Sequence, residues 1–300
     1  MINSMTRRDF IGTTLVGAGA MIAAPAWAKS ETKADSPSSA TDRIELGKTG
    51  IKASRIAMGT GANGYRRSSD QTRLGQEKFT KLIRHGIDSG LNFIDMADLY
   101  GSHSFMKNVL KEVKRDQLVL LSKVWFAGGG DMPKTDAARP EVERFLKELG
   151  TDHLDICLMH CLTDTDWPSH RKQMMDELSE MRQKGMVRAV GCSCHDLGAL
   201  KTAAQNPWVD VIFARINNKQ KKMDGMPEVI AAVLKEARKN GKAVVGMKIY
   251  GCGDLLAPEE QDASIRYVWG NQLVDAMTIG FTDPAQTDDT IQNLNKVLKA

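Results

Sequence analysis

The stretch that decides the fold is Asn92-Phe93-Ile94-Asp95-Met96-Ala97-Asp98-Leu99-Tyr100-Gly101. A short apolar segment runs into a polar loop, a pattern typical of a buried strand that ends at a surface. At this strand end a carboxylate, Asp95, stands five positions before a phenol, Tyr100. The pair predicts acid–base chemistry only if a cation lies near enough to lower the phenol's pKa from about 10.

The same strand-then-loop rhythm repeats along the chain. Apolar segments are expected to form strands at 55–60, 91–96, 118–124, 154–160, 187–193, 209–214, 243–248 and 274–280. Helical spacing lies between them, at 76–89, 102–114, 138–149, 170–184, 197–205, 227–240, 258–269 and 284–299. Several of these helices begin at Pro and end near Gly. Eight strands alternating with eight helices predict an α/β fold, a closed (β/α)8 TIM barrel preceded by a short N-terminal β-hairpin.

The competing architecture is an open, doubly wound sheet. It would need a glycine fingerprint that leads from the first strand directly into a helix. The segment Gly59-Thr60-Gly61-Ala62-Asn63-Gly64 is rich in glycine, but no helix follows it immediately. We interpret this segment as a loop. No linker divides residues 43–300, which are expected to form one barrel domain.

The first 42 residues have a different character. Thr6-Arg7-Arg8-Asp9-Phe10-Ile11 is a twin-arginine pattern, 12–24 is small and apolar, and Ala26-Trp27-Ala28 has the form of a cleavage site. Residues 1–28 are therefore expected to be a signal peptide, read by the twin-arginine export machinery, with the mature protein in the periplasm or otherwise exported. The alternative is an uncleaved anchor, but the apolar run is short for a membrane span. Residues 29–42 are polar and are expected to be a flexible linker.

Composition narrows the range of partners. The chain has 300 residues and a formal charge of +4, with no block of five basic residues, so no nucleic-acid partner is expected. No stable membrane span is expected in the mature chain. Five cysteines is an odd number, and two of them, Cys157 and Cys161, would lie about 13 Å apart on one strand at ~3.3 Å per residue. A disulfide framework is therefore not expected.

Ionisable residues end three consecutive predicted strands. Asp95 closes the second strand and Tyr100 follows it, while Lys123 closes the third and His160 the fourth. In a barrel these ends meet at one mouth, where functional side chains gather. Taken singly, each residue has an ordinary structural interpretation, such as a loop carboxylate, a surface lysine, a core histidine or a packing tyrosine. Their joint placement favours a catalytic site.

The segment Phe93–Gly101, with its Asp and Tyr, resembles the corresponding segment of the aldo-keto reductase family. Further similarity runs through 138–155, 184–193 and the last strand–helix unit, so it covers nearly the whole chain from about residue 43. The resemblance implies a catalytic tetrad of Asp95, Tyr100, Lys123 and His160. It also implies hydride transfer between NADP or NAD and a small carbonyl or alcohol substrate, with Tyr100 as the general acid and Lys123 lowering its pKa. His160 would orient the carbonyl oxygen.

The resemblance also implies a set of cofactor-binding positions at the strand ends. These candidates are Gly59, Thr60, Ser193, Cys194, Lys248, Ile249, Tyr250, Gly251, Gly280, Phe281 and Thr282. Cys194 stands where the family has an Asn that holds the carboxamide, so a two-donor amide is lost. The chain also departs from the NADP-preferring pattern, since no Lys or Arg occurs between Arg266 and Lys296. We therefore hypothesise a weakened preference for NADP.

Two other functions stay open. The first is a metal site, because Cys157, His160, Cys161, Cys192, Cys194 and His195 are close in sequence; strand alternation argues against it. The second is a non-catalytic or sensory barrel that holds a preloaded nicotinamide cofactor. The sequence does not identify the substrate. His103 stands where many relatives carry Glu, and the aromatic residues Trp125, Phe126 and Trp167 are interpreted either as a substrate wall or as packing at the rim.

Overall fold

A computed structural model describes residues 38–129 and 132–300. The predicted signal peptide and most of the predicted linker lie outside the described residues. Residues 38–42 belong to the linker prediction, yet Ala40 is fully buried and its N–H donates to Asn295 Oδ1 at 2.7 Å. That part of the linker prediction is wrong, because these residues pack against the last helix.

Eight parallel strands close into a barrel in the order β10-β3-β4-β5-β6-β7-β8-β9, which confirms the predicted (β/α)8 fold. Each strand lies within two residues of its predicted bounds. The strands are β3 (Ile56–Gly59), β4 (Phe93–Asp95), β5 (Val119–Val124), β6 (Leu154–Leu162), β7 (Val187–Cys194), β8 (Val211–Arg215), β9 (Ala243–Met247) and β10 (Ala276–Gly280).

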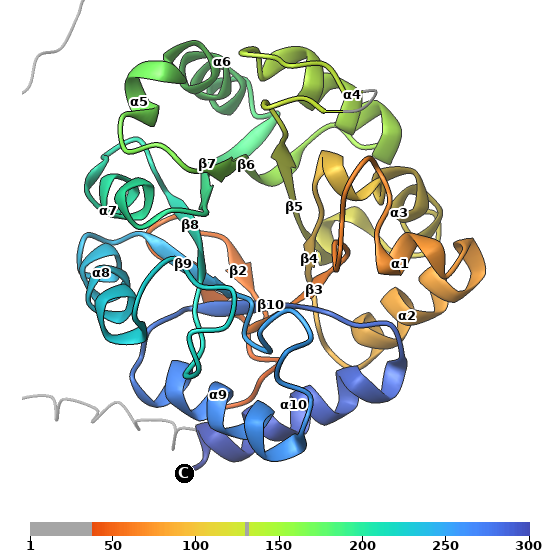
Figure 1. Cartoon of the computed structure of the whole chain (residues 1–300). Coiled ribbons are helices and arrows are strands. Elements are labelled where there is room, and N and C mark those ends of the chain that lie inside the picture. Colours follow the sequence, from red (N-terminus) through yellow and green to blue (C-terminus); the bar gives the residue numbers. More distant parts are fainter. Residues whose placement is uncertain (1–37, 130–131) are drawn as a thin grey trace, which may run out of the picture. The chain divides into compact units, whose positions relative to one another are not determined.

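The helices form an outer ring around these strands (Figure 1). They are α1 (Asp70–Arg73), α2 (Gln76–Asp88), α3 (His103–Val109), α4 (Arg139–Leu149), α5 (Trp167–His170), α6 (Lys172–Gln183), α7 (Leu197–Gln205), α8 (Pro227–Lys239), α9 (Pro258–Gly270) and α10 (Pro284–Leu298), with 3₁₀ turns η1 (Asp98–Tyr100) and η2 (Arg115–Gln117). The helix expected over 102–114 ends early, because the N–H groups of Lys111 and Glu112 bond three residues back and tighten the chain into turns.

The predicted hairpin is also present. Strands β1 (Ile44–Glu45) and β2 (Lys52–Ala53) pair in antiparallel fashion. Leu46, Ile51 and Ala53 from this hairpin are buried in one cluster with the side chains that fill the barrel interior. The hairpin therefore contributes apolar side chains to the inner core.

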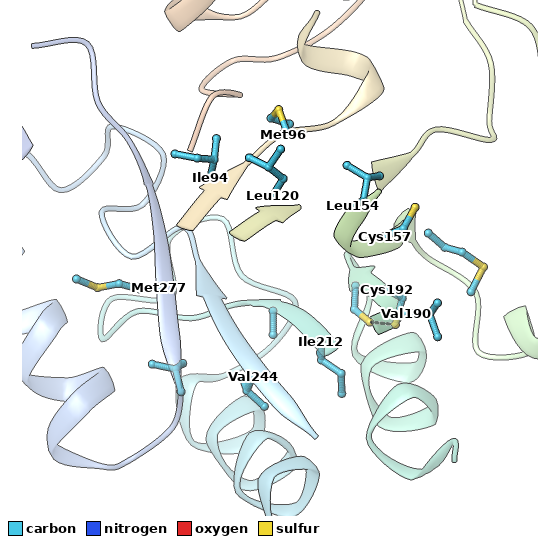
Figure 2. Close-up of a cluster of buried hydrophobic side chains, with 14 of the residues drawn as sticks. Ile94, Met96, Leu120, Leu154, Cys157, Val190, Cys192, Ile212, Val244 and Met277 are labelled. Atoms are coloured by element: carbon cyan, nitrogen blue, oxygen red, sulfur yellow. Dashed lines mark hydrogen bonds between the residues drawn. The ribbon is translucent and has the colours of Figure 1, made fainter. Parts of the chain in front are cut away.

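Side chains alternate between two cores along each strand. Phe93, Leu121 and Leu158 belong to the inner cluster. Their neighbours Ile94, Leu120 and Cys157 belong to the outer cluster between the strands and the helices (Figure 2). Because the period of a strand is two, the residue two positions after an inner core residue also points inward. This alternation sets which residues reach the mouth of the barrel.

Among the described residues, no helix has the length and apolar character that crossing a membrane requires.

Candidate active site

The carboxyl ends of the strands bring polar side chains to one mouth. Asp95 follows Phe93 by two positions, Lys123 follows Leu121, and His160 follows Leu158, so all three continue the inward-facing rows. Each is at least 95% buried. Tyr100 comes from η1, the 3₁₀ turn that follows β4. The structure therefore brings together the four residues of the predicted tetrad.

Lys123 is at the centre of the tetrad. Its ammonium group forms an ion pair with Asp95 and donates to the carbonyl oxygen of Met96 at 2.9 Å. The Tyr100 hydroxyl lies 3.5 Å from Lys123 Nζ and 3.5 Å from His160 Nε2. A phenol, an ammonium and an imidazole thus meet around one point at the mouth, where a small polar group of a substrate would contact the phenol and the imidazole together.

Burial determines the charge states at this point. It raises the pKa of Tyr100 well above its usual value, and the negative charge of Asp95 adds to the effect. The lowering that we expected from Lys123 is not found, because burial and, after it, the carboxylate of Asp95 raise the pKa of Tyr100. Burial, reinforced by the charge of Lys123, holds the pKa of His160 well below its usual value. At neutral pH the site therefore offers a protonated phenol and a neutral imidazole.

The loop after β3 covers the ring of Tyr100. A Cβ added to Gly61 would lie 2.3 Å from Tyr100 ring atoms, and one added to Gly64 would lie 2.5 Å from the ring. On another side Lys123 Nζ lies 4.9 Å from the centre of the same ring. The glycines that we interpreted as loop residues therefore allow the backbone to approach the Tyr100 phenol closely.

A β-bulge follows His160. The pairing of β6 with β7 shifts register between Met159 and Leu162, and Cys161 adopts a left-handed φ of 63°. The Cys161 N–H donates to Ser193 Oγ at 2.8 Å, and its Sγ lies 3.4 Å from His195 Nε2. Burial raises the pKa of the Cys161 thiol to about 11 and lowers the pKa of His195 to about 3, so both groups are neutral. Bulges of this kind often lie beside active sites.

The predicted cofactor positions fall into two groups. Ser193 is on the inner face of β7, and the αL residues Lys248 (φ 60°) and Gly251 (φ 61°) shape the loop after β9. Lys248 Nζ contacts Cys252 Sγ at 3.4 Å rather than a carboxylate. These three residues are placed where they could hold part of a cofactor.

Other predicted positions have structural partners instead. Cys194 is fully buried in the outer core, with its Sγ 3.7 Å from Cys192 Sγ (Figure 2). Thr60 Oγ1 donates to the carbonyl oxygen of Asp95 at 2.9 Å. Tyr250 contacts Thr290 of α10 through its hydroxyl at 3.2 Å. Ile249 is buried, and its carbonyl oxygen accepts from Ser264 Oγ at 2.6 Å.

The strand ends β3 and β10 are tightly packed. A Cβ on Gly59 would lie 3.0 Å from Thr278 Oγ1, and one on Gly280 would lie 3.0 Å from Ala62 Cβ. The Phe281 carbonyl oxygen accepts from Gln71 at 2.9 Å, and the Thr282 N–H donates to Gln286 at 2.8 Å. These residues connect the β10 end to α1 and α10.

The three aromatic residues have different surroundings. Trp125 is half-buried, and its ring meets that of His160 edge-on at 5.8 Å between centroids. Phe126 is buried beneath Arg171, whose guanidinium carbon lies 4.0 Å from the ring centre. Trp167 is buried near Trp208 and donates to the carbonyl oxygen of Ala199. Only Trp125 of these three contacts the tetrad; Phe126 and Trp167 pack at the rim.

Sequence reasoning missed two residues at the mouth. Thr278 Oγ1 donates to Asp95 Oδ2 at 2.8 Å, which holds the carboxylate that pairs with Lys123. Arg215 pairs with Asp224 and donates to the carbonyl oxygen of His195 at 2.9 Å. Strand alternation could have found both, since they follow the inward residues Ala276 and Phe213 by two positions.

Within the described part of the chain, no group of three His, Cys, Asp or Glu side chains is arranged to hold a metal ion.

Comparison with known proteins identifies the family of the chain. A model of the aldo/keto reductase family matches residues 55–300. The chain therefore belongs to the aldo/keto reductase family.

Individual relatives match over part of their length. The aldo-keto reductase YhdN of Bacillus subtilis is 30% identical over 168 residues, which is 51% of this chain and 47% of that protein. The NADH-specific methylglyoxal reductase of Escherichia coli is 27% identical over 190 residues, 58% of each chain. The chain thus spans about half the length of these curated relatives.

Solved structures share the fold over most of the chain. A putative aldo-keto reductase from Pseudomonas aeruginosa superposes with a TM-score of 0.69 at 23% identity, over 86% of this chain and 95% of that one. An aldo/keto reductase from Klebsiella pneumoniae in complex with NADP and acetate gives 0.63 at 18% identity, over 84% and 89%. At these identities the likeness concerns the fold alone.

Proposed function

We propose that the chain is a nicotinamide-dependent oxidoreductase that reduces the carbonyl group of a small aldehyde or ketone, with Tyr100 as the general acid. The observation that carries this proposal is the position of the Tyr100 hydroxyl, 3.5 Å from both Lys123 Nζ and His160 Nε2. A carbonyl oxygen placed among these groups would receive hydrogen bonds from the phenol and the imidazole together.

The chain has residues that fit a nicotinamide cofactor, NADP or NAD. The Ser193 hydroxyl lies on the inner face of β7, next to the bulge. Buried His160 Nδ1 has no hydrogen-bond partner among the described residues, so a polar ligand group could satisfy it. Lys248 and Gly251 would hold the phosphates. When bound, the cofactor supplies the hydride.

The chain's own residues perform the remaining tasks. Neutral His160 orients the carbonyl oxygen and stabilises the negative charge that develops on it. Tyr100 transfers its proton to the alkoxide, which is far more basic than a phenolate. Because burial and Asp95 raise the pKa of Tyr100, the phenol stays protonated and ready to donate at neutral pH. Lys123 stabilises the phenolate that remains.

Tyr100→Phe tests this assignment. We expect carbonyl reduction to be abolished and cofactor binding to be retained. Quenching of tryptophan fluorescence measures the binding. Methylglyoxal is a suitable first probe because one relative is a methylglyoxal reductase. Tyr267→Phe is the matched control, since that phenol belongs to α9 in the outer ring of helices. If Tyr100→Phe kept most of its turnover, the assignment would be wrong.

A non-catalytic barrel that holds a preloaded cofactor makes a different prediction. Stopped-flow mixing of the cofactor-loaded protein with an aldehyde separates the two functions. We expect the reduced cofactor to be oxidised in the wild type and to persist in Tyr100→Phe. Persistence in both proteins would favour the sensory function.

We also propose export by the twin-arginine route. The support is the sequence of residues 1–28, with Arg7 and Arg8 before an uncharged apolar run. Replacing both arginines by lysine should retain the full-length precursor in the cytoplasm, whereas the wild type should appear shortened in the exported fraction. Equal export of both proteins would overturn this proposal.

A further inference from the structure

Helix α4 contacts the Tyr100 turn on both sides. Asp98 stands two positions before Tyr100, and its buried carboxylate accepts from Arg144 Nη2 at 2.8 Å. His103 stands three positions after Tyr100, and its Nδ1 lies 2.9 Å from Glu148 Oε2. Residues on either side of the phenol are therefore bonded to the same helix.

The two residues of α4 are themselves paired. Arg144 and Glu148 are one helical turn apart, and Arg144 Nη1 lies 2.7 Å from Glu148 Oε1. Burial disfavours both charges. Hydrogen bonds to Glu141 and Glu148, with the charge of Asp98, nevertheless raise the pKa of Arg144. Hydrogen bonds from His103 and Arg144 lower the pKa of Glu148 to about 2. The pair is thus ionised at neutral pH.

The network continues from His103 into the barrel wall. His103 is 2% exposed, its Nε2 lies 2.7 Å from Ser122 Oγ, and its ring lies 4.5 Å from that of Phe145. Ser122 precedes Lys123 on β5, so one network connects the segment that carries the phenol with the strand that carries the ammonium. A glutamate in place of His103 would face Glu148, and the two carboxylates would repel each other.

We propose that Arg144 and Glu148 are positioning residues that hold the Tyr100 phenol against Lys123 and His160. The inference rests on the proposed function. Within the turn itself, the N–H groups of Tyr100 and Gly101 donate to the carbonyl oxygens of Ala97 and Asp98 at 3.1 and 3.3 Å. The 3₁₀ turn has only three residues, and Asp98 within it also pairs with Arg67 at 3.2 Å. The contacts from α4 are the ones that reach the turn both before and after Tyr100.

The test uses Arg144→Met and Glu148→Gln in the full chain. Each should lower kcat roughly 10- to 100-fold, as a displacement of about 1 Å can do, while the Kd for the cofactor changes less than about twofold. Arg144→Lys should restore part of the rate. The matched control is Arg139→Met, which removes an ion pair with Glu180 from the same helix without touching the Tyr100 turn. The control should keep its kcat.

A second measurement does not depend on turnover. The chain has four tyrosines, so Tyr100 can be assigned by ¹³Cζ-tyrosine NMR with the aid of Tyr100→Phe. In the wild type the phenol should stay protonated above pH 10. In the two variants a loosened turn would admit water, and the resonance should titrate nearer to about 10.

The outcomes distinguish the inference from the proposed function. If the wild type reduces no carbonyl but the Tyr100 titration still shifts in the variants, the positioning role stands and the proposed function fails. If both variants only unfold at lower urea concentrations, with kcat and the titration unchanged, Arg144 and Glu148 have a merely structural role and the inference is overturned. Where Arg144→Met does not fold, Glu148→Gln decides alone.

Discussion

The Tyr100 hydroxyl lies 3.5 Å from the ammonium group of Lys123, and that ammonium is already paired with Asp95. The carboxylate of Asp95 therefore neutralises the positive charge beside the phenol. Burial is the largest cause of the raised pKa of Tyr100. At neutral pH the Tyr100 phenol therefore stays neutral and keeps its proton.

Removing the carboxylate of Asp95 should destabilise the protein. Asp95→Asn leaves the buried Lys123 ammonium without its partner, and breaking such a pair typically costs about 3–5 kcal/mol. Turnover should also fall, because Lys123 and Thr278 lose the group that orients them. Urea unfolding measures the change. Asp262→Asn is the control, since its partly exposed pair with Arg266 should contribute about 0–1 kcal/mol. Equal effects of the two substitutions would contradict the burial argument.

A methyl group on Gly61 should displace the Tyr100 phenol. In Gly61→Ala the new Cβ would lie 2.3 Å from the Tyr100 ring, so the ring or the loop must move. The φ of Gly61 is not left-handed, so lack of space is the cause. We expect kcat to fall roughly 10- to 100-fold. Gly270→Ala, where nothing lies within 4 Å, should leave kcat unchanged. If Gly61→Ala kept the wild-type kcat, the loop would have moved without displacing Tyr100, and the prediction would be wrong.

Acid should weaken the fold partly through His195. Burial, with the positive charge of Arg215, lowers the pKa of His195 from 6.5 to about 3. Between these values the unfolded chain binds a proton that the folded chain does not, so the free energy of unfolding falls as the pH drops from 6.5 to 3. His195→Gln should flatten this slope in urea unfolding. The exposed His170, replaced by Gln, serves as the control, and two equal slopes would refute the prediction.

Cofactor choice can be measured directly. The loop after β10 has no basic residue, and it ends at the acidic residue Asp283, the N-cap of α10. We therefore expect no large advantage for NADPH over NADH. Fluorescence titrations give the two Kd values, and NADPH binding more than about tenfold tighter would refute the expectation. Lys248→Met should weaken the binding of NADPH and of NADH to a similar degree, since we propose that Lys248 binds the phosphates that both cofactors share.

Much of the site could be predicted because strand ends and alternation are local properties. The spacing of Asp95 and Tyr100 around one strand end followed from periodicity and resemblance. So did the positions of Lys123 and His160, which lie within two residues of the ends of β5 and β6. Cys194 shows where this reasoning stops. A family pattern suggested contact with the cofactor, but alternation on β7 directs the side chain into the outer core, against Cys192. Thr278 and Arg215 also continue inward-facing rows, so alternation could have found them, but it could not show their contacts with Asp95 and Asp224.

The sequence by itself determined the barrel, since apolar strands and amphipathic helices in strict alternation can bury their faces in few other ways. It also determined which ionisable residues stand at the strand ends. Only the tertiary structure decided their charges and their support. The pKa of Tyr100 depends on burial and on the carboxylate of Asp95, and the turn that carries Tyr100 is held by Arg144 and Glu148 from a helix some forty positions along the chain. Local patterns contain no information about such contacts, because electrostatics and packing act through space.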